Sequence, residues 1–376
     1  MTRTIVDIHV LQTVPPSNLN RDDTGSPKTA TYGGVRRARV SSQAWKRAVR
    51  RDFADLLDTN ELGVRTKRVV ELLVAAVRRE LPDVPEEDMT NVATAVLRAA
   101  GITVKEPRGA KGATPEAGYL LFLSAQQIRA LAGLAVEHMQ GADLDKKRAR
   151  RLLRDRNSVD LALFGRMVAE KDATDLYVDA ACQVAHALST HAVETEYDYF
   201  TAVDDHKAAQ ADEDAGAGMI GTVEFNSSTL YRYATVDVDR LVDNLGDREA
   251  TARAVEAFVR GFVTSMPAGK QNTFANRTLP DLVMVSLRHD QPVSYVGAFE
   301  TAVATTGEGR VTRSAEALAA YAIEVAEAYG VTPDATWIVG VGRAASAAEH
   351  LGERVTLDRL VQACGQAVRA GTTEPE

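Results

Sequence analysis

The sequence predicts an α+β protein with one large helical insertion. Strand-like and helix-like segments occur at both ends of the 376-residue chain, whereas apolar residues three to four positions apart dominate residues 62–180. A segment rich in Ala, Gly and Asp at 206–222 is typical of a projection from a compact body. These three observations favour a single α+β domain that carries a helical block between its two halves.

The N-terminal part predicts a strand, a long loop, a second strand and a helix. Apolar and polar residues alternate over 4–14, which is the period of a half-buried strand. Residues 15–34 are polar and rich in turn-forming residues, and a loop of this length in a compact domain is commonly functional. A short strand is expected at 35–40, and Ser41 and Ser42 are favourable N-caps for the helix that follows.

The rest of the chain predicts helices first, and then strands that alternate with helices. The stretch at 62–180 shows no strand pattern, and a turn-rich break at 105–118 divides its helices. A further helix is expected at about 174–190. The elements expected after it are strands at 223–225, 229–236, 282–287 and 337–341, and helices at 247–264, 311–329 and 356–370.

Composition and charge exclude several classes of protein. No apolar run approaches the ~20 residues of a membrane-spanning helix, and charges inside the apolar N-terminal stretch do not fit a secretion signal. The two cysteines, Cys182 and Cys364, lie in helix-like stretches, so we expect a reducing cytoplasm. The net charge is −8, but residues 1–57 carry +5 and the remainder −13. A basic patch on an acidic body indicates anion binding at one site.

The segment 28–51 predicts a cradle for a phosphate backbone. It contains eight basic residues and no acidic one. On a helix that begins at the paired serines, residues four apart share a face, so Lys46 and Arg50 form a basic stripe while Trp45 begins the buried one. The free N–H groups of the helix start, the serine hydroxyls and Gln43 suit an anion. The alternative is a solvated amphipathic helix, although like charges at this spacing repel each other.

A second basic run lies inside the helical insertion, where only Asp155 opposes it. Its members are Lys146, Lys147, Arg148, Arg150, Arg151, Arg154 and Arg156. A contact with a polyanion and a solvated helix face with acidic neighbours are equally compatible with this run.

No segment predicts a catalytic centre. Residues 340–345 resemble a dinucleotide-binding fingerprint, but too little chain follows to complete the expected βαβ unit. His186 and His191 have no acidic metal partner at a matching spacing, so we expect them to pack or to cap. The pairs at 22–23 and 204–205 are typical of turn caps, although they could gather a metal if the fold brought them together. We therefore expect no enzyme activity, no cofactor and no metal.

Two other classes of protein fit the chain less well. A nuclease or nucleotide-dependent enzyme would need a converging metal or phosphate-transfer site, and no nucleophile elbow or Walker loop occurs. A DNA-binding regulator would show a compact helix-turn-helix, which the N-terminal strand, loop and helix do not resemble.

Several blocks together resemble a known family. Residues 8–50 resemble the N-terminal signature of the CasC family, the CRISPR RNA-binding backbone subunits of the type I-E CRISPR effector complex, Cascade. Further similar blocks follow in the family's order: LFGRM (163–167), AHALSTH (185–191), DYFTAVDD (198–205), GTVEFNSSTLYRY (221–233) and PDLVMVSL (280–287). The resemblance spans most of the chain and is weakest at 58–160 and beyond about residue 330.

The resemblance implies a fold like a right hand, with a modified RRM-type, ferredoxin-like palm, helical fingers and a thumb. Residues 1–57 and 181–376 would form the palm, 58–180 the fingers and about 198–224 the thumb. The family role implied is a non-catalytic subunit that assembles with copies of itself and other Cascade subunits along the CRISPR RNA. The resulting cytoplasmic ribonucleoprotein filament presents the guide to target DNA in antiviral defence.

The resemblance also implies which side chains touch nucleic acid. The guide-backbone contacts would be Lys28, Ser41, Gln43, Lys46 and Arg50. Met167 and Phe200 match apolar residues beside a displaced guide nucleotide, and Lys146 and Lys147 match a basic finger patch that attracts target DNA. The thumb loop is longer and more acidic than the family pattern, so the thumb residues that meet a neighbouring subunit stay open.

Overall fold

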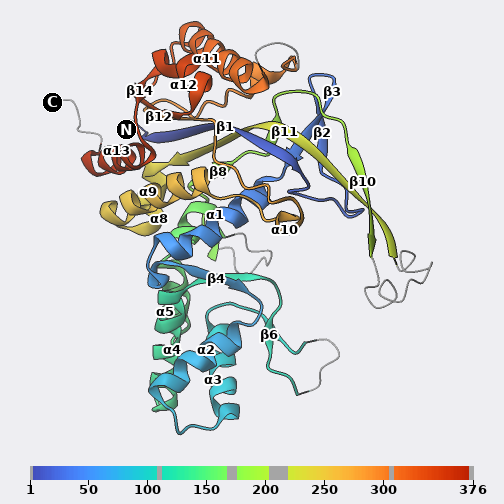
Figure 1. Ribbon diagram of the computed structural model, residues 1–376. Helices are drawn as coiled ribbons and strands as arrows, with labels where there is room; N and C mark the ends of the chain where they lie inside the picture. The colour runs from blue at the N-terminus through green and yellow to red at the C-terminus, as the bar shows by residue number, and fades with distance from the viewer. Residues whose placement is uncertain (1–2, 108–111, 167–175, 203–218, 305–308, 372–376) are drawn as a thin grey trace, which may run out of the picture. The chain divides into compact units, whose positions relative to one another are not determined.

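The computed structural model describes two compact units (Figure 1). The residues that it describes are 3–107, 112–166, 176–202, 219–304 and 309–371. Unit 1 consists of residues 1–49, 184–235 and 258–364, and unit 2 consists of residues 50–183, 236–257 and 365–376. Within the described ranges, no helix is both long and apolar enough to cross a membrane.

Unit 1 is built on a mixed β-sheet. Its strands are β1 (Ile5–Ser17), β2 (Thr29–Tyr32), β3 (Val35–Val40), β9 (Ala187–Ser189), β10 (Glu196–Ala202), β11 (Met219–Asp237), β12 (Leu282–Arg288), β13 (Ala335–Gly340) and β14 (Glu353–Arg354). Their order among the described residues is β14-β13-β12-β1-β11-β9-β3-β2, and β10 pairs with β11 outside this path. Strand β1 is central and nearly continuous in its burial, because side chains from both faces of the sheet enter a core.

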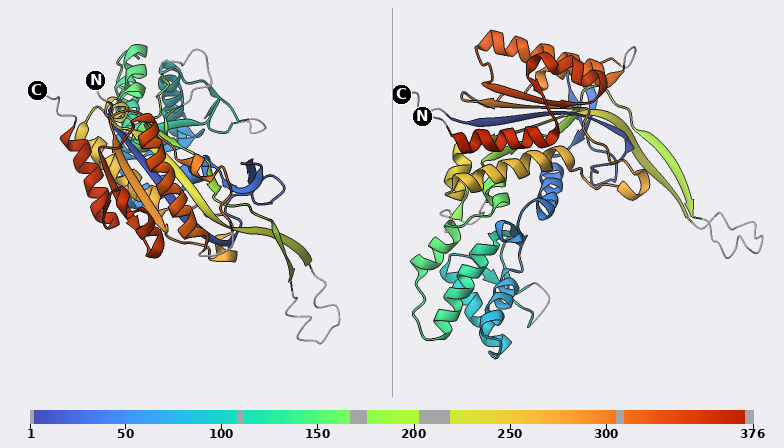
Figure 2. Two further views of the ribbon diagram at one scale, coloured as in Figure 1. Left: turned by 90° about the horizontal axis from the view of Figure 1, so that it is seen from above. Right: turned by 60° about the vertical axis from the view of Figure 1, so that its left-hand side comes forward.

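Helices cover both faces of this sheet (Figure 2). One face carries α11 (Arg310–Tyr329), α12 (Gly342–Ala348) and the 3₁₀ turn η3 (Val296–Phe299), whose apolar residues pack on Leu11, Tyr231 and Met284. The other face carries the first turns of α1 (Ser42–Leu56) and the last turns of α9 (Arg248–Thr264). The remaining helices of this face are α10 (Gln271–Phe274) and the start of α13 (Leu357–Ala370).

Arg232 of β11 is a buried cation on the face of the sheet that α1 and α9 cover. Its guanidinium lies 3.7 Å from the ring centroid of Trp45 and 4.5 Å from that of Phe262. It donates to Gln12 Oε1 at 2.6 Å and to the carbonyl oxygen of Phe262. Aromatic faces and neutral acceptors therefore stabilise a buried cation that has no carboxylate partner among the described residues.

Unit 2 contains a helical core with short strands at its margin. The helices are α2 (Val69–Glu80), α3 (Glu86–Ala99), α4 (Ala125–Met139), α5 (Lys146–Arg154), α6 (Val159–Phe164), α8 (Val238–Leu245) and the 3₁₀ turn η1 (Thr59–Glu61). Buried residues such as Leu73, Val77, Leu97 and Leu131 come from three of these helices and form one apolar cluster. The strands β4 (Gly63–Thr66) and β7 (Leu121–Ser124) pair antiparallel, as do β5 (Val104–Lys105) and β6 (Glu116–Ala117).

Two expectations about secondary structure are wrong. The stretch at 62–180 is not purely helical, because it contains β4 to β7. The apolar part of β7 is a run of three buried residues that ends at Ser124, and periodicity cannot distinguish so short a run from a buried helix. Where residues 174–190 are described, β8 (Cys182–Val184) and β9 replace the expected helix. Pairing of β9 between β11 and β3 overrides the helix propensity of its alanine-rich sequence.

A third difference concerns β11. The strands expected at 223–225 and 229–236 are one continuous strand, because Asn226 and Ser228 are buried in the sheet and do not form a turn. The strand at 35–40 and the helices that begin near residues 42, 248, 310 and 357 confirm the pattern-based expectations to within two residues.

We predict that Arg232→Ala lowers the unfolding free energy of unit 1 by about 4 kcal/mol, because it leaves a cavity and two unsatisfied acceptors. Arg232→Met keeps the apolar stem without the charge, so it should cost less than half as much. Both tryptophans, Trp45 and Trp337, belong to unit 1, so urea unfolding followed by tryptophan fluorescence measures the change.

Arg260→Ala is the matched control, because Arg260 makes an exposed ion pair with Asp358 and should cost about 0.5 kcal/mol. Equal losses for Arg232→Ala and Arg260→Ala would contradict a central role for Arg232.

Candidate nucleic-acid interface

A small basic pocket of about 20 Å³, with room for about one water molecule, lies in unit 1 between the segment 17–28 and strands β3 and β11, so a phosphate would rest at its mouth. The polar residues that line it include Asn20, Lys28, Arg39, Asn226 and Ser228. Lys28 and Arg39 are half-exposed, and no carboxylate belongs to its described lining. Two cations with amide and hydroxyl groups beside them are the donors that proteins use to hold a phosphodiester backbone.

Asn20 connects Lys28 to the start of α1 through two hydrogen bonds. Its backbone carbonyl accepts the N–H of Lys28 at 2.9 Å, and its side-chain Oδ1 accepts the N–H of Ser41 at 2.9 Å. The carbonyl of Lys28 in turn accepts the N–H of Arg39 at 2.9 Å. The loop expected at 15–34 is shorter in the structure, because β1 extends to Ser17 and Thr29–Tyr32 form β2. The remaining loop at 18–28 is ordered at its C-terminal end, where it fixes Lys28 beside the start of α1.

Helix α1 presents its first turn beside Lys28. Ser41 caps the helix, since its Oγ accepts the N–H of Ala44 at 3.2 Å. The hydroxyl hydrogen of Ser41 remains available to an anion. Gln43 is exposed and Lys46 is half-exposed, and residues three apart share a helix face. The structure thus brings Lys28, Ser41, Gln43 and Lys46 together in unit 1.

His186 adds a donor that the sequence did not single out for binding. Its Nδ1 accepts the N–H of Ser42 at 3.0 Å, so the neutral ring carries its proton on Nε2. Burial lowers the pKa of His186, and the charges of Arg39 and Lys28 lower it further. A neutral imidazole N–H therefore lies within the field of both cations, where a phosphate would offset their repulsion of the protonated ring.

Residues 269–271 are a second segment near the pocket that the sequence did not indicate as a binding segment. A Cβ on Gly269 would lie 2.2 Å from the carbonyl oxygen of Leu19, so only glycine allows this approach to the loop before Lys28. The next residue, Lys270, has a left-handed backbone with φ of 52°, and Gln271 is exposed. A lysine and an amide after a glycine turn are a weak sequence signal, because only the fold places them beside residues 18–20.

The β10–β11 hairpin extends from the sheet beside this region and carries Phe200 (Figures 1 and 2). Phe200 pairs with Gly221, and a Cβ at residue 221 would lie 2.3 Å from the Phe200 ring. The ring is nevertheless 46% exposed, so one face remains available to a partner. Residues 203–218 of the expected thumb and Met167 lie outside the described residues.

The other expected contacts belong to unit 2. Lys146 and Lys147 are exposed in the first turn of α5, which Asp145 caps by accepting the N–H groups of Lys147 and Arg148. Arg50 Nε lies 3.4 Å from Asp160 Oδ2, and Arg50 Cζ lies 4.7 Å from the ring centroid of Phe122. Arg50 therefore has internal partners that a ligand would have to share.

A family model described as CT1975-like protein matches residues 6–363. The chain belongs to the CT1975-like family. Among solved structures, this CT1975-like protein is 36% identical to a chain of a "CRISPR RNA-guided surveillance complex, pre-nicking", with a TM-score of 0.84 over 96% of this chain and 100% of that chain. A chain of a "CRISPR RNA-guided surveillance complex" is 32% identical, with a TM-score of 0.70 over 96% and 99%. The comparison with curated proteins gives no match.

Both histidines of this CT1975-like protein accept a backbone N–H group, one at the start of α1 and one within β11. His186 accepts the N–H of Ser42, and buried His191 accepts the N–H of Thr229 at 3.0 Å through Nε2. Among the described residues, no three His, Cys, Asp or Glu side chains gather as a metal site.

We predict that His191 makes stability depend on pH. Burial lowers its pKa from 6.5 to about 4, with Arg310 and Arg37 acting in the same direction. Between these values the unfolded chain binds a proton that the folded chain does not, so the unfolding free energy falls as the pH drops from 6.5 to 4. The His191 contribution is about 3 kcal/mol, and it should be constant below the folded-state pKa.

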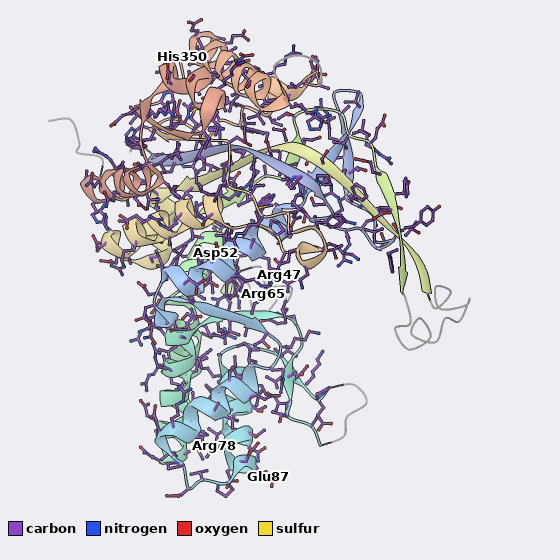
Figure 3. All side chains as sticks on the ribbon, in the orientation of Figure 1. Arg47, Asp52, Arg65, Arg78, Glu87 and His350 are labelled. Carbon is purple, nitrogen blue, oxygen red and sulfur yellow. The ribbon has the colours of Figure 1, made fainter. Side chains whose placement is uncertain are left out.

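His191→Gln keeps an acceptor for Thr229 and removes the titration, so urea midpoints measured from pH 7 to pH 4 should fall less steeply than in the wild type. Exposed His350 (Figure 3) provides the control, and His350→Gln should leave the slope unchanged. An identical slope for His191→Gln and the wild type would contradict this assignment.

Proposed function

We propose that this chain is a CRISPR RNA-binding backbone subunit of a surveillance complex of the type I-E Cascade class. The observation that carries the proposal is the full-length similarity to chains of CRISPR RNA-guided surveillance complexes, combined with the basic pocket of unit 1. On this proposal unit 1 is a modified RRM-like palm, unit 2 contains the fingers, and the β10–β11 hairpin is the thumb. The subunit acts without catalysis, in the cytoplasm, as part of antiviral defence.

The chemistry of the pocket supports guide binding without base selectivity. Lys28, Lys46 and the hydroxyl group of Ser41 suit phosphate oxygens, and such contacts carry no sequence information. The N–H groups of Ser41, Ser42 and Ala44 at the start of α1 are not free for a phosphate as the sequence predicted, because they donate to Asn20, His186 and the Ser41 hydroxyl oxygen. Asn20 orders this set before any ligand arrives, so binding needs little rearrangement. A subunit that binds any spacer in the same way can assemble side by side with copies of itself along one guide.

The exposed ring of Phe200 supports a role at a displaced nucleotide. An apolar ring face can occupy the space that one unstacked base leaves, and base–aromatic contact is worth about 1–3 kcal/mol. Guide segments between displaced nucleotides would then be free to pair with target DNA. Lys146 and Lys147 on α5 would attract that DNA through its phosphates.

We predict that Lys28→Ala combined with Lys46→Ala weakens binding of all single-stranded RNAs alike. Loss of two phosphate contacts should reduce the slope of log K against log salt by about 1.4. Filter binding of two RNAs of unrelated sequence over a salt series measures both effects.

Arg354→Ala combined with Arg359→Ala removes the same charge near β14, at the opposite sheet edge from β2, and should leave the slope unchanged. An unaltered slope in the Lys28/Lys46 variant, or an equal change in the control, would overturn the cradle assignment.

We also predict that Lys146→Ala combined with Lys147→Ala leaves the RNA-loaded complex intact and slows capture of duplex DNA, most strongly at low salt. Stopped-flow association with labelled duplex measures the rate. Arg78→Ala combined with Arg79→Ala removes two exposed charges from α2 of the same unit (Figure 3) and should leave the rate near that of the wild type. Failure of the Lys146/Lys147 variant to assemble on RNA would instead place this patch on the guide.

A further inference from the structure

Unit 2 contains a pocket of about 560 Å³ that the guide-binding role does not use. It lies where the C-terminal end of α5, the bridge between Arg166 and Val178, and the C-terminal end of α8 meet. Small-molecule sites in proteins are commonly about 300–1,000 Å³ in volume. The pocket is therefore large enough for a ligand of nucleotide size.

Four arginines supply the positive charge of the pocket, and three aspartates also line it. Arg166 is 3% exposed and donates to the carbonyl oxygens of Leu176, Phe122 and Leu153 at 2.7, 3.1 and 2.7 Å. A guanidinium has five N–H donors, so two of them have no acceptor among these bonds. The cation is buried with carbonyl partners and no carboxylate within 4 Å in the described part of the chain, which leaves positive potential at the pocket wall.

The other three arginines are exposed at the pocket. Arg240 is held by Asp179 at 2.7 Å, whereas Arg154 and Arg156 make no side-chain hydrogen bond or ion pair within the described residues. Arg156 has a left-handed backbone with φ of 60°, which directs the chain sharply between α5 and α6. Backbone conformations of this kind are uncommon outside glycine and persist where surrounding contacts fix them.

A network of amides fixes the wall before any ligand binds. Asn244 Nδ2 donates to the carbonyl oxygens of Ala162 and Asp179 at 2.9 and 2.8 Å, and Asn157 Nδ2 donates to the carbonyl of Asn244 at 3.1 Å. Gln127 donates to the carbonyl of Asp155 at 3.0 Å and thereby orders the turn that carries Arg156. A preorganised wall lowers the cost of immobilising a ligand.

The remaining groups indicate more than a bare phosphate. Asp155 and Asp243 line the pocket and form no ion pair with a described residue; carboxylates repel a phosphate but accept hydrogen bonds from ribose hydroxyls and base amino groups. Tyr177 is 55% exposed at the rim, where an aromatic face can stack on a base. Cations, carboxylates and an aromatic ring together match the three parts of a nucleotide.

We propose that this pocket binds a nucleoside monophosphate unit, either free or as one residue of a nucleic-acid strand. The arginines hold the phosphate, a carboxylate accepts from the ribose or the base, and Tyr177 stacks on the base. The proposal does not depend on guide binding by unit 1, because every residue that it uses belongs to unit 2.

Calorimetric titration of the RNA-free, full-length protein with AMP, adenosine and inorganic phosphate tests the proposal. AMP should bind at least about tenfold more tightly than adenosine or phosphate, because each of these keeps only part of the contacts. Phosphate binding as tight as AMP binding would overturn the nucleoside part, and no heat from millimolar AMP would overturn the whole proposal.

Two substitutions locate the binding. Arg156→Asn removes the charge with a residue that tolerates a left-handed backbone, and Arg240→Gln removes a second cation; each should weaken AMP binding about tenfold. Arg151→Gln changes an exposed arginine of α5 outside the pocket lining and should leave binding within about twofold. Unchanged AMP affinity in both pocket variants, with native circular dichroism, would overturn the assignment.

The source of the ligand follows from competition. If a single-stranded oligonucleotide displaces AMP, and Arg156→Asn weakens both, the pocket receives one residue of a strand. If the oligonucleotide leaves AMP bound, the pocket receives a free nucleotide. Both results support the proposal and separate its two forms.

Discussion

The guanidinium of Arg232, held between the rings of Trp45 and Phe262, ties together the part of the protein that carries the basic pocket. Four segments that are far apart in sequence meet at this group: Trp45 belongs to α1, Gln12 to β1, Arg232 itself to β11 and Phe262 to α9. Gln12 accepts one of the hydrogen bonds of the guanidinium. Burial lowers the pKa of Arg232 to about 9, yet the group stays mostly protonated near neutral pH. Removing any of its partners would expose a buried charge to an apolar core, which is why this contact constrains α1, β1, β11 and α9 together.

Two other buried arginines follow the same principle at the places where the fold turns. Arg37 donates to the carbonyls of Tyr32, Ser189, Phe299 and Glu300, and so anchors the β2–β3 hairpin. Gly33 completes that anchor, because a Cβ there would overlap the carbonyl of Glu300. In unit 2, Arg166 donates to the carbonyls of Leu176, Phe122 and Leu153 and so connects three segments. Carbonyl acceptors let these cations organise loops from inside the core, where backbone oxygens take the place of a carboxylate partner.

This rigid interior explains how flexible surface cations can form a defined interface. The groups proposed to meet the guide are long, solvated side chains, but their backbones are fixed by Asn20, the Ser41 cap and the His186 acceptor. The charged side chains at the surface then supply the affinity for the guide, and the hydrogen bonds that fix their backbones determine where the guide binds. The unit 2 pocket is built in a similar way, because amide side chains order its wall and the arginines supply its positive charge.

The sequence by itself determined the α+β class, the apolar stripe of α1, the serine cap and the clustering of basic residues at 28–51, because these depend on local periodicity and composition. It did not reveal β7 or β9, whose short apolar or alanine-rich runs become strands only through pairing. It also could not assign Asn20 to the basic pocket, place His186 at the start of α1 or Lys270 beside residues 18–20, nor show that Arg50 faces Asp160. Those contacts join residues that are distant in the chain, and only the tertiary structure decides which side chains a packed core leaves beside one another.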